Sequence, residues 1–279
     1  MLVRIWADGS QEPHPLLPKK YSDKAMPITM PMPNRESRCQ KFMFVVCCVR
    51  SYIQAHVWAA YLRNMVQVQG VQFQYGEEGP RMTFPDFSCQ PGDRMLLLGQ
   101  SGTGKTTLLH LLCGMLKAQA GILNVAGQDL RAASDREIDN WRGQALGVVF
   151  QRAHFVQSLT IQENLALPHQ LTQGRVPSEV LDRMGSMLDR LGIAHRAEAR
   201  PHELSVGEQQ RASIARALLH KPQVVFADEP TSALDDHNAA AVMDILDREA
   251  AEATLVVVTH DQRLKDRYPH CVTLSPNQA

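Results

Sequence analysis

The sequence predicts an α/β fold with a mainly parallel core sheet. Short apolar runs, rich in valine, recur along the chain and alternate with segments of helical pattern. Strands of a parallel sheet are buried on both faces and therefore read as continuous apolar runs. A glycine-rich turn joins one such run to an apolar helical segment. The stretch at about 152–222 has no strong strand pattern, which predicts a helical insertion within the alternation.

The individual elements follow from the spacing of apolar residues. Near-alternating apolar residues predict a strand at 66–75. Continuous apolar runs predict buried strands at 95–98, 145–150, 224–227 and 255–258, and the apolar segment 106–116 predicts a buried helix. An amphipathic helix is predicted where six apolar residues share one helical stripe: Val180, Leu181, Met184, Met187, Leu188 and Leu191.

The composition of the chain changes near residue 65. The 279 residues carry 29 Lys or Arg and 29 Asp or Glu, and this zero net charge argues against a dedicated nucleic-acid binder. Residues 1–64 hold nine of the basic residues, only four of the acidic ones and six of the 16 prolines. We therefore expect 1–64 to be a disordered extension or a misassigned start, and 65–279 to be the folded domain. No run of 18 uninterrupted apolar residues predicts a membrane span.

One motif has the spacing of a phosphate-binding loop, GxxxxGK[ST], and it lies between a predicted strand and a predicted helix. Its residues are Gly99, Gln100, Ser101, Gly102, Thr103, Gly104, Lys105 and Thr106. Glycines let the backbone wrap around a polyphosphate, so that successive N–H groups and the helix N-terminus face the anion. Lys105 can add a cation to the β- and γ-phosphates, and the Thr106 hydroxyl can ligate Mg²⁺.

A pair of carboxylates closes another predicted strand. Asp228 and Glu229 follow the run 224–227 and precede Pro230. In phosphate-loop enzymes a strand of this kind lies beside the loop, and its terminal Asp holds Mg²⁺. We therefore expect Asp228 to bind the metal and Glu229 to polarise an attacking water.

With these residues in place, the segment from about 65 to 274 resembles the nucleotide-binding subunit of an ATP-binding cassette (ABC) transporter. The run 204–208, Leu-Ser-Val-Gly-Glu, lies where that family has its LSGGQ signature. Ser205 and Gly207 match the family pattern, while Val206 and Glu208 depart from it. Independently of the resemblance, Ser205 and Glu208 have the spacing of a capping box at a helix N-terminus.

The resemblance assigns further site residues. Tyr75 is similar to the aromatic residue that stacks on adenine, and Thr107 joins the nucleotide-binding set. Gln151 resembles the loop glutamine that contacts Mg²⁺ and water, and His260 resembles the switch histidine near the γ-phosphate. The run 232–235 resembles the loop that communicates across the dimer. Implied metal ligands are Thr106, Gln151 and Asp228; implied catalytic residues are Lys105, Gln151, Glu229 and His260.

The resemblance also implies a fold, a mechanism and partners. The fold is that of an ABC-type ATPase, with an antiparallel β subdomain beside the parallel sheet and a helical insertion. Two subunits, identical or alike, hold ATP and Mg²⁺ between the phosphate loop of one chain and the signature of the other. In that family Ser205, Gly207 and Glu208 would therefore act on the facing subunit. Hydrolysis would drive separate integral membrane permease subunits.

Within the family, the run 159–165 is most similar to the lipoprotein-releasing and macrolide-export (LolD/MacB-like) group. That similarity implies export or release of a lipid, lipoprotein or drug, and a peripheral position on the cytoplasmic face of the inner (plasma) membrane. A non-transport ATPase of the cell-division or DNA-repair type is the alternative. A basic surface or a long coiled coil would favour the DNA-repair type, and neither pattern is visible.

Overall fold

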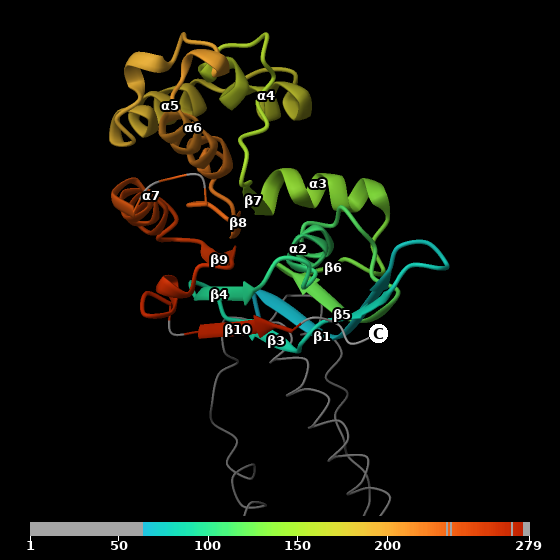
Figure 1. The fold of residues 1–279 in the computed structure, drawn as a ribbon. Coiled ribbons are helices and arrows are strands. Elements are labelled where there is room, and N and C mark those ends of the chain that lie inside the picture. Colours follow the sequence, from blue (N-terminus) through green and yellow to red (C-terminus); the bar gives the residue numbers. More distant parts are fainter. Residues whose placement is uncertain (1–63, 233, 235, 269, 276–279) are drawn as a thin grey trace, which may run out of the picture. The chain divides into compact units, whose positions relative to one another are not determined.

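The computed structural model describes residues 64–275 except 233, 235 and 269. The predicted extension at 1–64 therefore lies almost wholly outside the described residues, as do two positions of the run 232–235. The described strands form two five-stranded sheets, one antiparallel and one parallel, and the helices pack around them (Figure 1). The predicted α/β fold class is thus confirmed.

The parallel sheet carries the residues that matter for function. Its strands are β4 (Arg94–Gly99), β7 (Leu146–Val149), β8 (Val224–Asp228), β9 (Thr254–Thr259) and β10 (His270–Leu274). Their order across the sheet is β10-β4-β9-β8-β7, and every neighbouring pair is parallel. The four apolar runs after residue 90 are therefore the three central strands and one edge strand of a single sheet.

Strands β4, β8 and β9 are buried on both faces of this sheet, which explains why they read as unbroken apolar runs. Leu96 and Leu98 face one core cluster, whereas Met95 and Leu97 face the other. The same alternation divides β8 and β9 between the two clusters. Burying a Val or Leu side chain contributes about 1.5–3 kcal/mol, so a polar residue in either register would be costly.

The antiparallel sheet lies on one side of the parallel one. It consists of β1 (Val66–Gln74), β2 (Arg81–Thr83), β3 (Phe87–Cys89), β5 (Ala120–Val125) and β6 (Gln128–Asp129), with β1 pairing with β2, β3 and β5. Helices α2 (Lys105–Leu112) and α3 (Asp135–Ala145) share its core cluster. Helix α2 ends four residues earlier than predicted, because Gly114 follows it with a left-handed φ of 65°.

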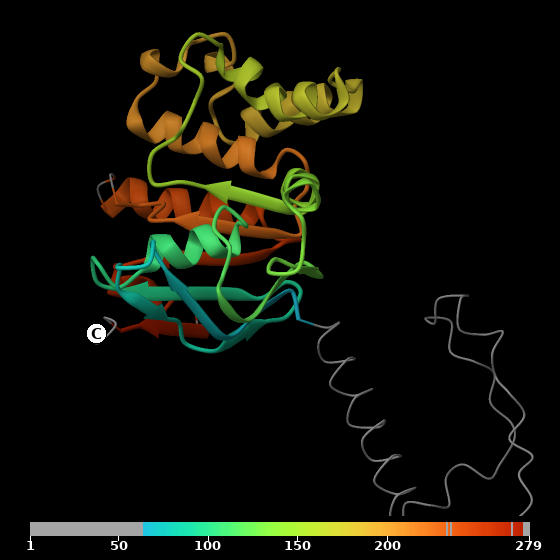
Figure 2. The same ribbon diagram turned by 90° about the vertical axis from the view of Figure 1, so that its right-hand side faces the viewer.

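Helices occupy the interval between β7 and β8, where no strand was predicted. They are α4 (Ile161–Gln173), α5 (Ser178–Arg190) and α6 (Val206–Leu218), with short 3₁₀ turns at Ala194–Arg196 and Pro201–Glu203. Figure 2 shows this segment, in yellow and orange, stacked at one end of the sheets. Helix α7 (Asp236–Glu249) connects β8 to β9. None of the described helices combines the length and apolar character needed to cross a membrane.

The amphipathic stripe of α5 was predicted correctly except at one residue. Val180, Met184, Met187, Leu188 and the following Leu191 are buried. Leu181 is 50% exposed, so its assignment to the buried stripe was wrong. It lies at the margin of the stripe, one residue after Val180, where a helix turns by about 100° per residue and carries it away from the core.

Candidate functional site

The candidate site is positioned by three neighbouring strands of the parallel sheet, whose carboxyl ends lie side by side. β4 and β9 pair with Leu98 opposite Thr259, and β8 and β9 pair with Asp228 opposite Val258. The chain segments that follow these strands must therefore meet. In open α/β sheets, ligands bind beyond the carboxyl ends of the strands.

The phosphate loop joins β4 to α2 through glycines that have conformational and steric reasons to be there. Gly102 and Gly104 have φ values of 82° and 88°, in the left-handed region that favours glycine. A Cβ on Gly99 would lie 2.4 Å from the Thr103 hydroxyl oxygen. Gly104 is the N-cap of α2 and supplies no side-chain cap to the helix N-terminus. The N–H groups of the first turn are consequently suited to an anion.

Lys105 is folded back along the loop. Its ammonium nitrogen donates hydrogen bonds to the carbonyl oxygens of Gly99 at 2.7 Å and Gln100 at 3.1 Å. It also lies 3.7 Å from Oε1 of Glu229, and both side chains are nearly buried. A cation held here would face an incoming phosphate without a large rearrangement of the backbone.

Glu229 is held in place by donors from the end of β9. Oε2 accepts from the hydroxyl of Thr259 at 2.8 Å, and Oε1 accepts from the His260 backbone N–H at 3.1 Å and from its Nδ1 at 2.8 Å. Glu229 itself has a φ of 46°, and its backbone N–H donates to the Val258 carbonyl at 2.7 Å. A left-handed non-glycine residue costs about 1–2 kcal/mol, and such strain persists mostly at functional sites.

Asp228 lies beside Glu229 in a different environment. Burial raises the pKa of its carboxyl, and the adjacent Glu229 charge raises it further, while His110 and Lys105 oppose the shift. A buried carboxylate of this kind gains most from a nearby cation. The sequence order Asp-Glu thus places two carboxylates in two distinct settings at one strand end.

A cavity of about 430 Å³ brings the predicted residues together. It is lined by Met82, Ser101, Gly102, Gly104, Lys105, Thr106, Thr107, Gln151, Asp228, Glu229 and His260. The side-chain nitrogen of Gln151 donates to the Ser232 hydroxyl at 3.0 Å, so the loop after β7 is tied to the loop after β8. Gly99, Gln100 and Thr103 form the base of the phosphate loop and are not among the lining residues.

Tyr75 is also outside the lining of this cavity. Its hydroxyl lies 3.3 Å from the Thr107 hydroxyl oxygen, and its ring packs edge-on against Phe73 with centroids 4.7 Å apart. The side chain is 48% exposed. The structure therefore leaves an accessible aromatic ring whose hydroxyl contacts α2, the helix that follows the phosphate loop.

The residues of the predicted signature lie on a separate element, the N-terminus of α6. Ser205 and Glu208 form the predicted capping box: Oε2 of Glu208 accepts from the Ser205 N–H at 2.8 Å, and the Ser205 hydroxyl accepts from the Glu208 N–H at 3.3 Å. Ser205 and Val206 are exposed, and Val206 is 57% exposed. Neither they nor Gly207 and Glu208 line the cavity described above.

The donor set in the cavity fits Mg²⁺. The Thr106 hydroxyl, the Asp228 carboxylate and the Gln151 amide carry oxygen atoms that can ligate a metal, and all three residues line the cavity. In the described part of the chain, no group of three or more His, Cys, Asp or Glu side chains could hold a metal by itself. Mg²⁺ is commonly held by one or two carboxylates and completed by substrate phosphates, so a single carboxylate is compatible with it.

Sequence reasoning missed two contributors to the site. Met82, on the short strand β2, lines the cavity although its surroundings in the sequence give no signal. Thr259 contacts Glu229, and its one signal was that a polar residue directly follows the predicted strand 255–258. Ser232, expected only as part of the loop that communicates across the dimer, also contacts Gln151.

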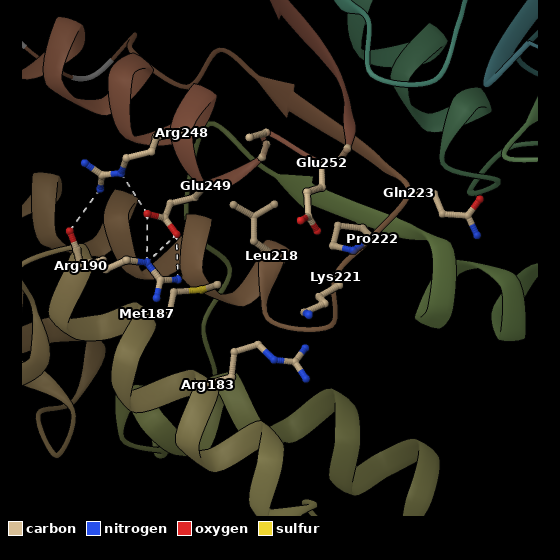
Figure 3. Close-up of a pocket in the computed structure, with 13 residues that line it drawn as sticks. Arg183, Met187, Arg190, Leu218, Lys221, Pro222, Gln223, Arg248, Glu249 and Glu252 are labelled. Atoms are coloured by element: carbon tan, nitrogen blue, oxygen red, sulfur yellow. Dashed lines mark hydrogen bonds and ion pairs between the residues drawn. The ribbon is translucent and has the colours of Figure 1, made fainter.

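A second cavity, of about 460 Å³, lies near the amino ends of β8 and β9 (Figure 3). Gln223 and Ala253, just before β8 and β9, line it together with the ends of α5, α6 and α7. There Arg190 forms a two-pronged ion pair with Glu249, which also contacts Arg248. These contacts join α5 to α7 and share no residue with the candidate site.

The chain is similar to known ATP-binding subunits of transporters. The family model described as "ABC transporter" matches residues 84–232. The lipoprotein-releasing system ATP-binding protein LolD of Idiomarina loihiensis is 40% identical over 185 residues, covering 65% of this chain and 80% of that protein. The pyoverdine export ATP-binding/permease protein PvdT of Pseudomonas entomophila is 38% identical over 192 residues, covering 68% of this chain and 29% of that protein.

Solved structures agree. A dimeric post-hydrolysis state of the ATP-binding cassette MJ0796, bound to ADP and Pi, matches with a TM-score of 0.67 and 29% identity, covering 76% of this chain and 95% of that one. The cbiO1 protein from Clostridium perfringens, part of the ABC transporter complex cbiONQ, matches with a TM-score of 0.63 and 25% identity, covering 71% and 79%.

The fold and the cavity define a phosphate-loop ATPase. The chain belongs to the ABC transporter family, and it is an ATP-binding, ATP-hydrolysing transporter subunit. The predicted family and activity are confirmed, and similarity to LolD and PvdT fits the predicted subgroup. The non-transport alternative is not favoured.

Proposed function

We propose that this subunit binds ATP with Mg²⁺ in the cavity at the ends of β4, β8 and β9, and that it hydrolyses ATP when it faces a second subunit. The observation that carries the proposal is the convergence of Lys105, Asp228, Glu229 and His260 on one cavity. Lys105 lies more than 100 positions before the other three residues in the chain. Their assembly requires the whole sheet to fold.

The phosphate loop supplies positioning and charge. Its backbone N–H groups and the N-terminus of α2 would cradle the phosphates, and Lys105 would pair with the β- and γ-phosphates instead of the Gly99 and Gln100 carbonyls it now contacts. Thr106, Asp228 and Gln151 would hold Mg²⁺, which when bound neutralises charge on the phosphate oxygens. Tyr75, exposed beside α2, would stack on the base.

Glu229 would orient the water that attacks the γ-phosphate. Its carboxylate is fixed by Thr259 and His260, so the oxygen that accepts the proton has a defined direction. His260, which lines the same cavity, would contact the γ-phosphate. Most of the rate enhancement would come from positioning and preorganised charge, as in other phosphoryl-transfer sites.

The reaction chamber would be completed by the signature of a second subunit. Ser205 and the N-terminus of α6 are exposed and lie outside the cavity of their own chain. A helix N-terminus with an exposed hydroxyl is suited to a phosphate group. Two copies, or this chain with a like ATPase, would therefore stack so that each signature faces the other chain's phosphate loop.

The partner that uses this cycle would be an integral membrane permease made of separate subunits. The names of the LolD and PvdT relatives support release or export of a lipid, lipoprotein or drug. The subunit would act peripherally, on the cytoplasmic face of the inner membrane. No nucleic acid is expected among its ligands, since the full chain has no net positive charge.

The experiment that tests this function is nucleotide binding by Lys105→Ala. Removing the ammonium group should weaken ATP affinity by about 100-fold or more, because charge-assisted contacts to phosphate are lost in a largely buried site. Lys117→Ala removes an exposed lysine from the connection between α2 and β5 and serves as the matched control. Unchanged ATP affinity in Lys105→Ala, measured by titration calorimetry with magnesium present, would contradict the proposal.

A further inference from the structure

The signature helix begins beside an ion pair that the sequence did not indicate. Oε1 of Glu208 accepts a hydrogen bond from Nε of Arg196 at 2.9 Å, and His195 Nε2 lies 3.5 Å from the same oxygen. The other oxygen of Glu208 is occupied by the capping box with Ser205. The Glu208 side chain is 12% exposed and Arg196 is 38% exposed.

Glu208 creates an electrostatic conflict at this position. A carboxylate at the third residue of a helix stabilises its N-terminus through the helix dipole and the capping box. The same negative charge opposes any second anion that approaches that N-terminus. Hydrogen bonds from Arg196 and from Ser205 lower the pKa of Glu208 to about 2, so the charge is present throughout the neutral range.

Arg196 offsets this charge through its contact with the carboxylate. Ser205 and Val206 are exposed, whereas Glu208 is buried and its Oε1 accepts from Nε of Arg196. A guanidinium at hydrogen-bond distance cancels most of the field that an isolated carboxylate would project at the exposed side.

The segment that carries Arg196 is itself tied to α4. Arg196 ends the short 3₁₀ turn Ala194–Arg196. In the residues that follow, the Ala197 carbonyl accepts from the Gln162 N–H at 3.0 Å, and the Ala199 carbonyl accepts from the Ile161 N–H at 2.9 Å. Arg196 therefore links the signature helix to the first turn of α4.

We propose that Arg196 is a positioning residue of the signature: it fixes the N-terminus of α6 and neutralises Glu208, so that Ser205 and the helix amides can receive the γ-phosphate of ATP held by a facing subunit. This inference rests on the proposed composite site. It assigns no chemistry to Arg196 itself, which acts through Glu208.

The test compares four full-length proteins that all carry Glu229→Gln, which should trap the ATP-bound dimer: the parent, Arg196→Ala, Glu208→Gln, and the double variant. Glutamine keeps an oxygen that can accept from the Ser205 N–H but carries no charge. ATP-driven dimerisation is measured by analytical ultracentrifugation, and ATP affinity of the single chain is measured separately.

We expect Arg196→Ala to weaken ATP-driven dimerisation by about tenfold, because the nearly buried Glu208 carboxylate loses its guanidinium partner. ATP affinity of the single chain should not change, because its own cavity is intact. Adding Glu208→Gln to Arg196→Ala should restore dimerisation to within about threefold of the parent, because the uncompensated charge is gone. Arg175→Ala is the control, since Arg175 is an exposed residue between α4 and α5.

Two results would overturn the inference. If Arg196→Ala dimerises like the parent, Arg196 does not position the signature. If the double variant is as impaired as Arg196→Ala, the residue supports the 3₁₀ segment and not the charge balance. Failure of the proposed function would look different, because the parent itself would then fail to dimerise with ATP.

Discussion

The two regions assigned to ATP differ in how complete they are within one chain. The cavity at the ends of β4, β8 and β9 is lined by residues from several elements and is stabilised by mutual contacts such as Glu229 with His260. The N-terminus of α6 is a single exposed element whose capping groups are satisfied by its own neighbours. The first region can hold a ligand alone, whereas the second offers only a surface.

This difference teaches where each region gets its precision. In the cavity, strand register sets the distances, because Asp228, Thr259 and the start of the phosphate loop lie at adjacent strand ends. At α6, the capping box and the contact with Arg196 set the helix N-terminus, and the distance to any phosphate depends on a partner. Changes in the cavity should therefore affect binding or chemistry, and changes at α6 should affect association.

The largest effect should come from Glu229→Gln. The amide cannot accept the proton of the attacking water, so we expect steady-state ATP hydrolysis to fall by about 100- to 1,000-fold. ATP binding should persist, and the ATP-bound dimer should accumulate on a sizing column. Glu252→Gln, at an exposed position before β9, controls for the loss of a carboxylate. Hydrolysis at the parental rate would show that Glu229 is not the general base.

A smaller effect concerns the stability of α6 as pH falls. The pKa of Glu208 is lowered from 4.5 to about 2 by Arg196 and Ser205. A lowered carboxyl pKa stabilises the folded state above the unfolded pKa, and this contribution is lost as pH falls from 4.5 toward 2. The difference in unfolding free energy between the parent and Glu208→Gln should therefore be constant near neutral pH and shrink below about pH 4.5.

Urea titrations followed by circular dichroism measure this difference at each pH. In the neutral range, the Arg196→Ala variant should have a lower free energy of unfolding than the parent. This difference should shrink as Glu208 becomes protonated. A difference that grew on acidification would have the wrong sign for an ionised Glu208 and would contradict the ion pair.

The sequence allowed the parallel sheet and most of the cavity to be predicted, for a physical reason. Strands buried on both faces tolerate few polar residues, so 224–227 and 255–258 stand out as apolar runs. The loop 99–106 has a spacing that few other functions require. Polar residues at the ends of such strands are then natural site candidates.

Other features left no such trace. β2 and β6 have three and two residues, too few for any period to appear, so Met82 could not be placed in the site. Arg196 and Glu208 lie 12 positions apart across irregular chain, a separation to which no helix or strand periodicity applies. The capping box of Ser205 with Glu208 was predictable because it is local; the ion pair that completes it depends on tertiary folding.

The central claim is that one ATP site needs the cavity of one chain and the signature of another. It is tested by mixing two inactive variants, Lys105→Ala and Gly207→Asp. Aspartate fits the fold at 207, since a Cβ there would meet nothing nearer than Arg211 at 3.8 Å, but it places a charge where the phosphate should bind. In a two-fold dimer the mixed pair contains one intact composite site out of two. In an equal mixture about half of the dimers are mixed, so ATPase activity should return to about a quarter of the parental value. If the mixture is no more active than its two components, the phosphate loop of one chain does not work with the signature of the other, and the account is wrong.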